Sequence, residues 1–174
     1  MPDPDRRAGA TPDPSAELTG EDLETWAAMA TVLEWLPAAL DGQLQRDSQL
    51  THFEYGMLYA LAQAPDCTLR MSVLAGYANS TLSRLSRAAT RMEAKGWLRR
   101  APDPADGRYT LATLTDLGQE KVRSATPGHV DVVHRLVLDP LTQSQKRQLH
   151  QISRLIARAI RDEDSWRPPA GDQT

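Results

Sequence analysis

The side chains best suited to recognition chemistry lie in residues 82–93, where arginines alternate with small hydroxyl residues. Wound as a helix at about 100° per residue, this segment would gather its apolar side chains on one stripe: Leu82, Leu85, Ala88, Ala89 and Met92. The opposite face is polar and carries Ser83, Arg84, Arg87, Thr90 and Arg91. Guanidinium groups pair bidentately with guanine, and hydroxyls reach bases or phosphates, so this face suits a DNA major groove. A merely solvated surface helix is the alternative.

The segments on either side of this helix favour the DNA-binding interpretation. Residues 70–78 hold apolar side chains at helical spacing. Residues 79–81 are Asn, Ser and Thr, which cap helix N-termini through their side-chain oxygens. Two short helices joined by a capping turn form a helix-turn-helix, whose second helix enters the major groove.

A hairpin is predicted directly after the second helix. Gly96 lies where a C-terminal cap belongs, and residues 97–100 and 108–114 read as two strands. The turn formers of residues 101–107 separate them, and Asp106-Gly107 is a strong hairpin signal. Residues 67–69 are expected to add a short third strand. A hairpin packed behind a helix-turn-helix is a winged helix, so the predicted fold class is mainly α (α+β).

Five sequence blocks resemble the multiple-antibiotic-resistance regulator (MarR) family in order and spacing. They are LTHFEY (50–55), SRLSR (83–87), RMEAKGWLRR (91–100), DPADGR (103–108) and LTDLG (114–118). The wing motif Asp-x-Arg ahead of Leu-Thr-x-x-Gly is the most specific of them, and the resemblance covers roughly residues 20–162. It implies a homodimeric winged helix-turn-helix transcription regulator that is often released from DNA by a small molecule.

Long helices flank the predicted winged helix. Residues 19–48 have apolar side chains at helical spacing, with a kink expected at Pro37. Residues 116–137 should form a helix kinked or interrupted at 127–128, and a last helix begins near Thr142. Their apolar faces lack partners in a lone winged helix. We therefore expect residues 19–48 and 116–163 to form a dimerisation region, residues 50–115 the DNA-binding domain, and residues 1–18 and 164–174 disordered or flexible tails.

Two sets of site residues follow from these interpretations. The expected DNA contacts are Thr81, Ser83, Arg84, Ser86, Arg87, Arg91, Asp106 and Arg108. Ser86 falls at the flank of the polar face and is included because it aligns with the family's helix motif. The resemblance also implies an aromatic or phenolic acid effector, for which Trp26, His52 and Tyr55 are candidate contacts. Ordinary packing is the alternative for these three side chains.

The charge distribution fits an oriented approach to DNA. Residues 81–108 hold seven cations and three acids, a balance of +4. The rest of the chain carries a balance of −7, and the two together give the net charge of −3. No apolar run approaches the roughly 20 residues of a membrane span, and the start lacks a secretory core. The single Cys67 excludes an internal disulfide framework. These features favour the cytoplasm.

Catalysis finds little support in the sequence. His129 and His134 are five residues apart and would not share a helical face as a metal pair. A phosphate loop, a nucleophile elbow and a paired-cysteine metal motif are all missing, so we expect no enzyme activity and no cofactor. Cys67 fits a small buried hydrophobe better than a redox switch. The main rival function is a winged-helix protein-interaction module, which would select no palindromic DNA.

Overall fold

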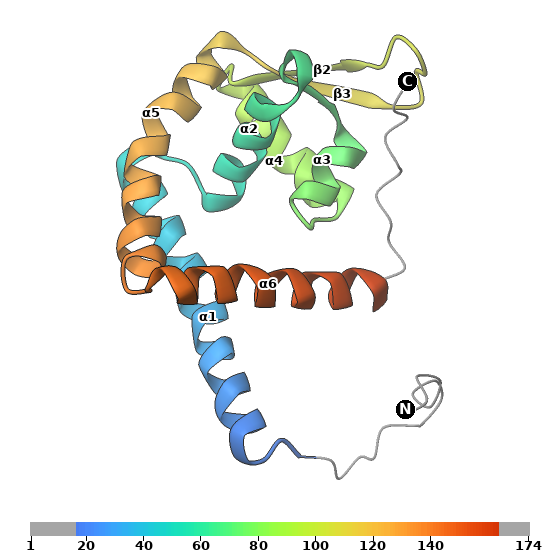
Figure 1. Ribbon diagram of the computed structural model, residues 1–174. Helices are drawn as coiled ribbons and strands as arrows, with labels where there is room; N and C mark the ends of the chain where they lie inside the picture. The colour runs from blue at the N-terminus through green and yellow to red at the C-terminus, as the bar shows by residue number, and fades with distance from the viewer. Residues whose placement is uncertain (1–16, 164–174) are drawn as a thin grey trace. The chain divides into compact units, whose positions relative to one another are not determined.

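The structure is a computed structural model that describes residues 17–163, so residues 1–16 of the predicted tail 1–18 and the predicted tail 164–174 lie outside the described residues. It is mainly helical with a small antiparallel sheet (Figure 1). In chain order the elements are α1 (Gly20–Ser48), α2 (His52–Gln63), η1 (Pro65–Cys67), β1 (Thr68–Arg70), α3 (Met71–Tyr77), α4 (Leu82–Ala94), β2 (Leu98–Pro102), β3 (Thr110–Leu114), α5 (Asp116–Val133), η2 (His134–Leu138) and α6 (Gln143–Glu163). No described helix is long and apolar enough to span a membrane.

The chain divides into two compact units at Pro37, inside α1. Helical structure continues through this proline, so Pro37 does not end the helix. The first unit, described from residue 17 to 36, exposes large apolar side chains: Leu23, Trp26, Val32, Leu33 and Trp35. The second unit contains the winged helix and the C-terminal helices.

A single apolar core holds α2, α3, α4 and the sheet together. Its largest fully buried side chains are Leu44, Leu50, Met57, Leu58, Leu61, Leu74, Leu85, Met92 and Leu98. The predicted apolar stripe of α4 is confirmed for Leu85, Ala88, Ala89 and Met92. It is wrong for Leu82, which is 53% exposed because it occupies the first helical position, before the helix reaches the core. Packing of this stripe turns the opposite face of α4 to the surface.

Local hydrogen bonds fix where the helices of the winged helix begin and end. Thr51 and Glu54 form a reciprocal capping box at the start of α2, as the sequence indicates. Gly96 has a φ of +72°, and the Trp97 N–H donates to the Met92 carbonyl at 3.0 Å. This left-handed cap ends α4 and turns the chain into β2.

The sheet has the strand order β1-β3-β2, with both pairs antiparallel. In its register Leu98 faces Leu114, and Arg70 faces Leu111. The third strand is therefore confirmed, one residue later than predicted. The hairpin strands are also shifted: β2 extends to Pro102, and β3 starts only at Thr110, because residues 103–109 form their own hydrogen-bonded loop.

Helix α5 runs without interruption through Pro127 to Val133, so of the kink or interruption expected at 127–128, the interruption is wrong. Proline removes one N–H from the helix ladder, but α5 packs along α2 at this level, and the Tyr55 and Thr126 hydroxyls are 3.1 Å apart. Tertiary packing thus accompanies helical structure that continues through a residue that would destabilise an isolated helix. The irregularity comes later, in the π-helical turn η2.

Candidate nucleic-acid interface

The polar face of α4 is presented at the surface by its packing and by its N-cap. Thr81 accepts a hydrogen bond from the Arg84 N–H at 3.3 Å, so its hydroxyl already caps the helix. Thr81, Ser83, Arg84 and Arg87 are exposed, whereas Ser86 is only partly so. The expected recognition face therefore exists as a contiguous surface on the first two turns of α4.

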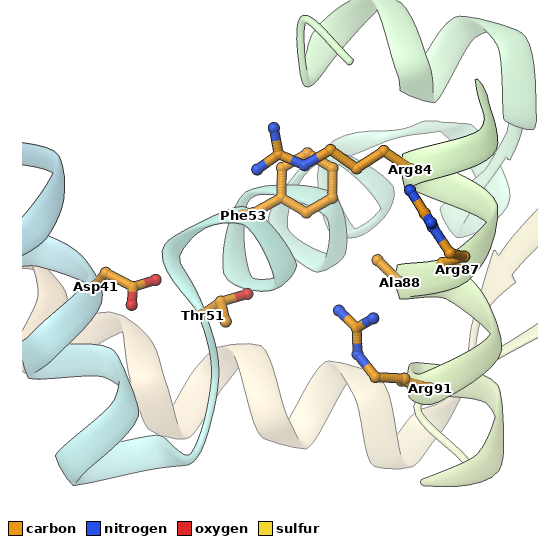
Figure 2. A pocket seen from close by; sticks show the side chains of 7 residues that line it. All are labelled: Asp41, Thr51, Phe53, Arg84, Arg87, Ala88 and Arg91. Carbon is orange, nitrogen blue, oxygen red and sulfur yellow. The ribbon is translucent and has the colours of Figure 1, made fainter. Parts of the chain in front are cut away.

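A polar pocket of about 360 Å³ opens beside this face (Figure 2). It is lined by Asp41, Thr51, Phe53, Arg84, Arg87, Ala88 and Arg91. The Arg84 guanidinium lies over the Phe53 ring, 4.7 Å from its centre, which orients the cation without neutralising it. Three guanidinium groups and one carboxylate, that of Asp41, line this hollow, and an excess of cations suits phosphate oxygens.

Arg91 has a structural partner that the sequence did not reveal. Its Nε and Nη2 donate to Oε1 of Glu54 at 3.2 and 3.0 Å, although the two residues are 37 positions apart. Burial alone would raise the pKa of Glu54, but hydrogen bonds from the Thr51 N–H and from Arg91 outweigh it and lower the pKa. The Glu54 carboxylate thus links the start of α2 to α4. Arg91 stays more than half exposed and keeps donors for a second anion.

Ser86 is engaged by a second unforeseen arginine. The Arg100 guanidinium donates to Glu93 Oε2 at 2.7 Å, to Thr90 Oγ1 at 2.9 Å and to Ser86 Oγ at 3.3 Å. The hydrogen bond from Arg100 is the largest cause that lowers the pKa of Glu93. Arg100 therefore ties β2 to α4, and the Ser86 hydroxyl belongs partly to that contact. Sequence spacing does not reveal this pairing, because the partners of Arg100 are seven to fourteen residues away and lie on another element.

The wing carries the predicted pair of Asp106 and Arg108. Arg108 Nη2 lies 2.6 Å from Asp106 Oδ2, and the Arg108 backbone N–H donates to Oδ1 at 3.1 Å. The hydrogen bond from Arg108 lowers the pKa of Asp106, and the same bond raises the pKa of Arg108. The Arg108 side chain is 83% exposed. A surface ion pair that closes a turn and an oriented cation are both compatible with this geometry.

Arg87 on α4 and Arg99 on β2 are cations without an internal partner in the described part of the chain. Within residues 17–163, their side chains make no ion pair, hydrogen bond or ring contact with the rest of the chain. Arg87 lies on the exposed face of α4, and Arg99 lies on β2. These two side chains can reorient toward a ligand without breaking an internal contact.

The structure assembles two of the three candidate effector contacts. His52 and Tyr55 lie together on α2, and both contact His129 of α5, with ring centres 5.6 and 4.6 Å from it. Trp26 belongs to the other compact unit. The sequence presents His129 only as a candidate catalytic or metal-binding residue. Nothing in its spacing from His52, on a helix far along the chain, indicates the contact.

The comparisons with known proteins agree with this geometry. The MarR family model matches residues 48–108. The structure of Sco3205, a MarR family transcriptional regulator from Streptomyces coelicolor in complex with DNA, has a TM-score of 0.81 and 42% identity, covering 90% of this chain and 97% of that one. AbsC, a MarR family regulator from the same organism, has a TM-score of 0.81 and 32% identity, covering 85% of this chain and 99% of that one.

Among curated relatives, the uncharacterised HTH-type transcriptional regulator YdcH of Bacillus subtilis is 30% identical over 90 residues. That match covers 49% of this chain and 60% of YdcH, so the chain spans somewhat over half the length of this relative. The two Streptomyces structures, by contrast, are covered almost completely. With its winged helix and the exposed arginine face of α4, the chain belongs to the MarR family of transcriptional regulators.

Proposed function

We propose that the chain is a homodimeric regulator that binds an inverted-repeat operator through α4 and the wing. The observation that carries this proposal is the exposed face of α4, where Ser83, Arg84 and Arg87 stand clear of the core. Sco3205, which is 42% identical, has been solved in complex with DNA, and this supports the same partner here. Two recognition helices related by two-fold symmetry would enter successive major grooves about one helical turn apart.

The residues of this surface take different roles in the proposal. Ser83 and Arg87 read base edges, because they are exposed and unengaged, while Arg84 is pre-oriented by Phe53. Arg91 and Arg99 contact phosphates and contribute affinity for any sequence. Thr81 and Ser86 contribute mainly by capping α4 and by holding Arg100.

In the wing, Arg108 enters the minor groove, with its guanidinium oriented by Asp106. Narrow A·T tracts concentrate negative potential there, which favours an inserted arginine. Major-groove reading by α4 and minor-groove contact by the wing would then address adjacent parts of one half-site.

The dimer is proposed from apolar surface that a monomer leaves in water. On α6, Leu149, Ile152, Leu155, Ile156 and Ile160 are all between 40% and 67% exposed. Side chains of α1 such as Trp26, Leu33 and Trp35 are exposed as well. Burying such faces between two copies is the favourable solution for helices with one apolar stripe. In this division residues 19–48 and 116–163 form the dimerisation region and residues 50–115 the DNA-binding domain.

Regulation would follow from occupancy of the operator. A dimer seated on a promoter excludes the polymerase, so we propose a repressor. A small aromatic acid would release it, with His52 and Tyr55 among its contacts and Trp26 as a further candidate. The His52 and His129 imidazoles each carry a buried Nδ1 that has no hydrogen-bond partner within the described residues, which supports a polar ligand at this position.

Selection from a random duplex pool tests the proposed function. The wild-type chain should enrich an inverted repeat, and Arg87→Ala should lose about 1–3 kcal/mol of operator binding with an unchanged thermal melt. Arg123→Ala is a matched control, since Arg123 is an exposed arginine of α5 paired with Glu120. Enrichment of no dyad would refute the proposal, and unchanged affinity of Arg87→Ala would remove Arg87 from base reading.

A further inference from the structure

Arg70 links the helix-turn-helix to the wing through its side chain. Arg70 occupies the N-cap position of α3. It is also the last residue of β1, which pairs with β3. The Arg70 Nε donates to Oδ2 of Asp103 at 2.8 Å. One residue thus joins the first helix of the helix-turn-helix to the loop between β2 and β3.

Asp103 is built into the base of this loop. The residue is 7% exposed, its Oδ1 accepts the Ala105 N–H at 2.9 Å, and its own N–H donates to the Tyr109 carbonyl at 2.9 Å. The Ala105 N–H first, and Arg70 after it, lower the pKa of Asp103, so the carboxylate is ionised at neutral pH. A largely buried carboxylate with two donors is a fixed anchor for the guanidinium.

Tyr109 completes the connection to the wing arginine. The Arg70 guanidinium lies 4.5 Å from the centre of the Tyr109 ring, and the Arg108 guanidinium lies 6.0 Å from the same ring. The Tyr109 N–H in turn donates to the carbonyl of Asp106, the partner of Arg108. The guanidinium of Arg70, the residue at the N-cap of α3, and the guanidinium proposed to contact DNA are therefore separated by one aromatic ring.

We propose that Arg70 is a positioning residue for DNA binding. It holds the loop between β2 and β3 in the orientation that lets Arg108 and α4 contact one half-site together. This inference rests on the proposed function. Arg70 does not need to touch DNA in this role. Its guanidinium supplies both the directional Nε hydrogen bond and the planar face over Tyr109. The ammonium group of a lysine cannot supply both at once. Loss of the guanidinium should leave the core intact and allow the loop of residues 103–109 to open.

A double-mutant cycle on the full chain tests the coupling of Arg70 to Arg108. Arg70→Gln, Arg70→Lys and Arg108→Ala should each weaken binding to the selected operator by about ten-fold. The double variant Arg70→Gln/Arg108→Ala should be no more than about two-fold weaker than Arg108→Ala alone, because a wing without Arg108 has nothing left to position. Arg123→Gln removes the same charge and an exposed ion pair on α5, and it should leave affinity unchanged.

Amide hydrogen exchange provides a readout that needs no DNA. In Arg70→Gln the N–H groups of Ala105 and Tyr109 should exchange at least about ten-fold faster, while those of α4 keep their wild-type rates. Independent losses in the cycle, about 100-fold in total, or full affinity of Arg70→Lys, would overturn the positioning role. Unchanged exchange at both amides would overturn it as well. Failure of the wild type to bind any duplex would instead refute the proposed function, and the exchange rates would still decide whether Arg70 holds the wing.

Discussion

The arginines between residues 84 and 108 look alike in the sequence but fall into distinct classes in the structure. Arg100 is committed to Glu93 and the hydroxyls of α4, and Arg91 is shared between Glu54 and solvent. Arg87 is unengaged within the described chain. The expected positive patch is therefore partly neutralised from within. Its capacity to bind an anion is concentrated at Arg84, Arg87 and the exposed side of Arg91.

Gly118 is the residue at which the fold tolerates no added atom. A Cβ there would lie 2.0 Å from the Trp97 carbonyl oxygen, and that carbonyl already accepts the Thr115 N–H. We expect Gly118→Ala to lower the free energy of unfolding by about 1–3 kcal/mol or more, since the backbone of α5 must move away from β2. Chemical denaturation measures this change directly.

Gly56 is the matched control for that experiment. It also lies in a helix, but it is exposed, and a Cβ there would meet nothing within 4 Å. Gly56→Ala should therefore stabilise the chain by about 0.5–1 kcal/mol, through the unfolded-state entropy of glycine. A Gly118→Ala variant as stable as Gly56→Ala would contradict the close approach of α5 and β2.

For single residues, the sequence predicted which side chains are exposed or buried better than it predicted their contact partners. Helical periodicity placed Arg87 on the exposed face of α4 and Leu85 in the core, and both placements are confirmed. It could not predict that Glu54 reaches Arg91, because periodicity relates only residues on the same element. The same limit hid the contacts of Arg100 and Arg70, each of which joins separate elements.

Between elements, the junction of α2 and α5 is where buried polar groups gather. Among the described residues, the buried side-chain atoms without a hydrogen-bond partner are Gln43 Oε1, His52 Nδ1 and His129 Nδ1. A Cβ on Gly128, next to His129, would lie 3.1 Å from Gln43 Nε2, so α1 reaches the same place. Buried polar atoms are nearly always hydrogen-bonded, so a polar ligand, an ion or a water is the expected partner at this junction.

The histidine pair gives this junction a pH dependence. Burial lowers the pKa of both imidazoles below the ordinary 6.5, and His52 lowers that of His129 further, although Asp41 opposes the shift of His52. Below about pH 6.5 the unfolded chain binds more protons than the folded one, so the free energy of unfolding falls as the pH falls. Stability should thus be lower at about pH 5.5 than at about pH 7.5.

Replacing His129 with Gln should reduce that difference, because one of the two depressed groups no longer titrates. His150 is exposed on α6, and His150→Gln should leave the difference unchanged. Urea denaturation of the three proteins at the two pH values measures the effect. A His129→Gln variant with the full wild-type difference would show that the carboxylates, and not this pair, determine the acid sensitivity.

Element boundaries also show where local signals fail. The left-handed cap at Gly96 depends on local sequence, and it was predicted at the right residue. Pro127 gave an equally local signal for a kinked or interrupted helix, and the interruption is wrong, since α5 continues through Pro127 where α2 packs beside it. Burial of a helix against its neighbours outweighs the loss of one backbone hydrogen bond.

For the whole molecule, the proposed function depends on the association of two copies of the chain. Ile152 and Leu155 of α6 are 53% and 67% exposed in the single chain. In the proposed dimer they become buried, and an unpaired charge there would cost several kcal/mol. Leu155→Asp should therefore be a folded monomer, or should aggregate, and should lose most operator affinity. Sedimentation at micromolar concentration distinguishes these states.

Arg154 supplies the control on the same helix. It lies two residues from Ile152, about 200° around the helix axis and away from the apolar stripe, and it is exposed. Arg154→Glu should sediment as a dimer like the wild type. A wild type that sediments as a monomer would contradict the proposed assembly, whatever the variants do.

The unengaged state of Arg87 has a consequence for how new specificities arise. Because Arg87 and Ser83 support neither the core nor a neighbouring element, exchanging them alters the reading surface at little cost in stability. Arg91 and Arg100 lack that freedom, since each also ties α4 to another element. A library randomised at residues 83 and 87 should thus yield mostly folded proteins with altered operators. In adaptive terms, the helix separates the positions that can vary from those that must be kept.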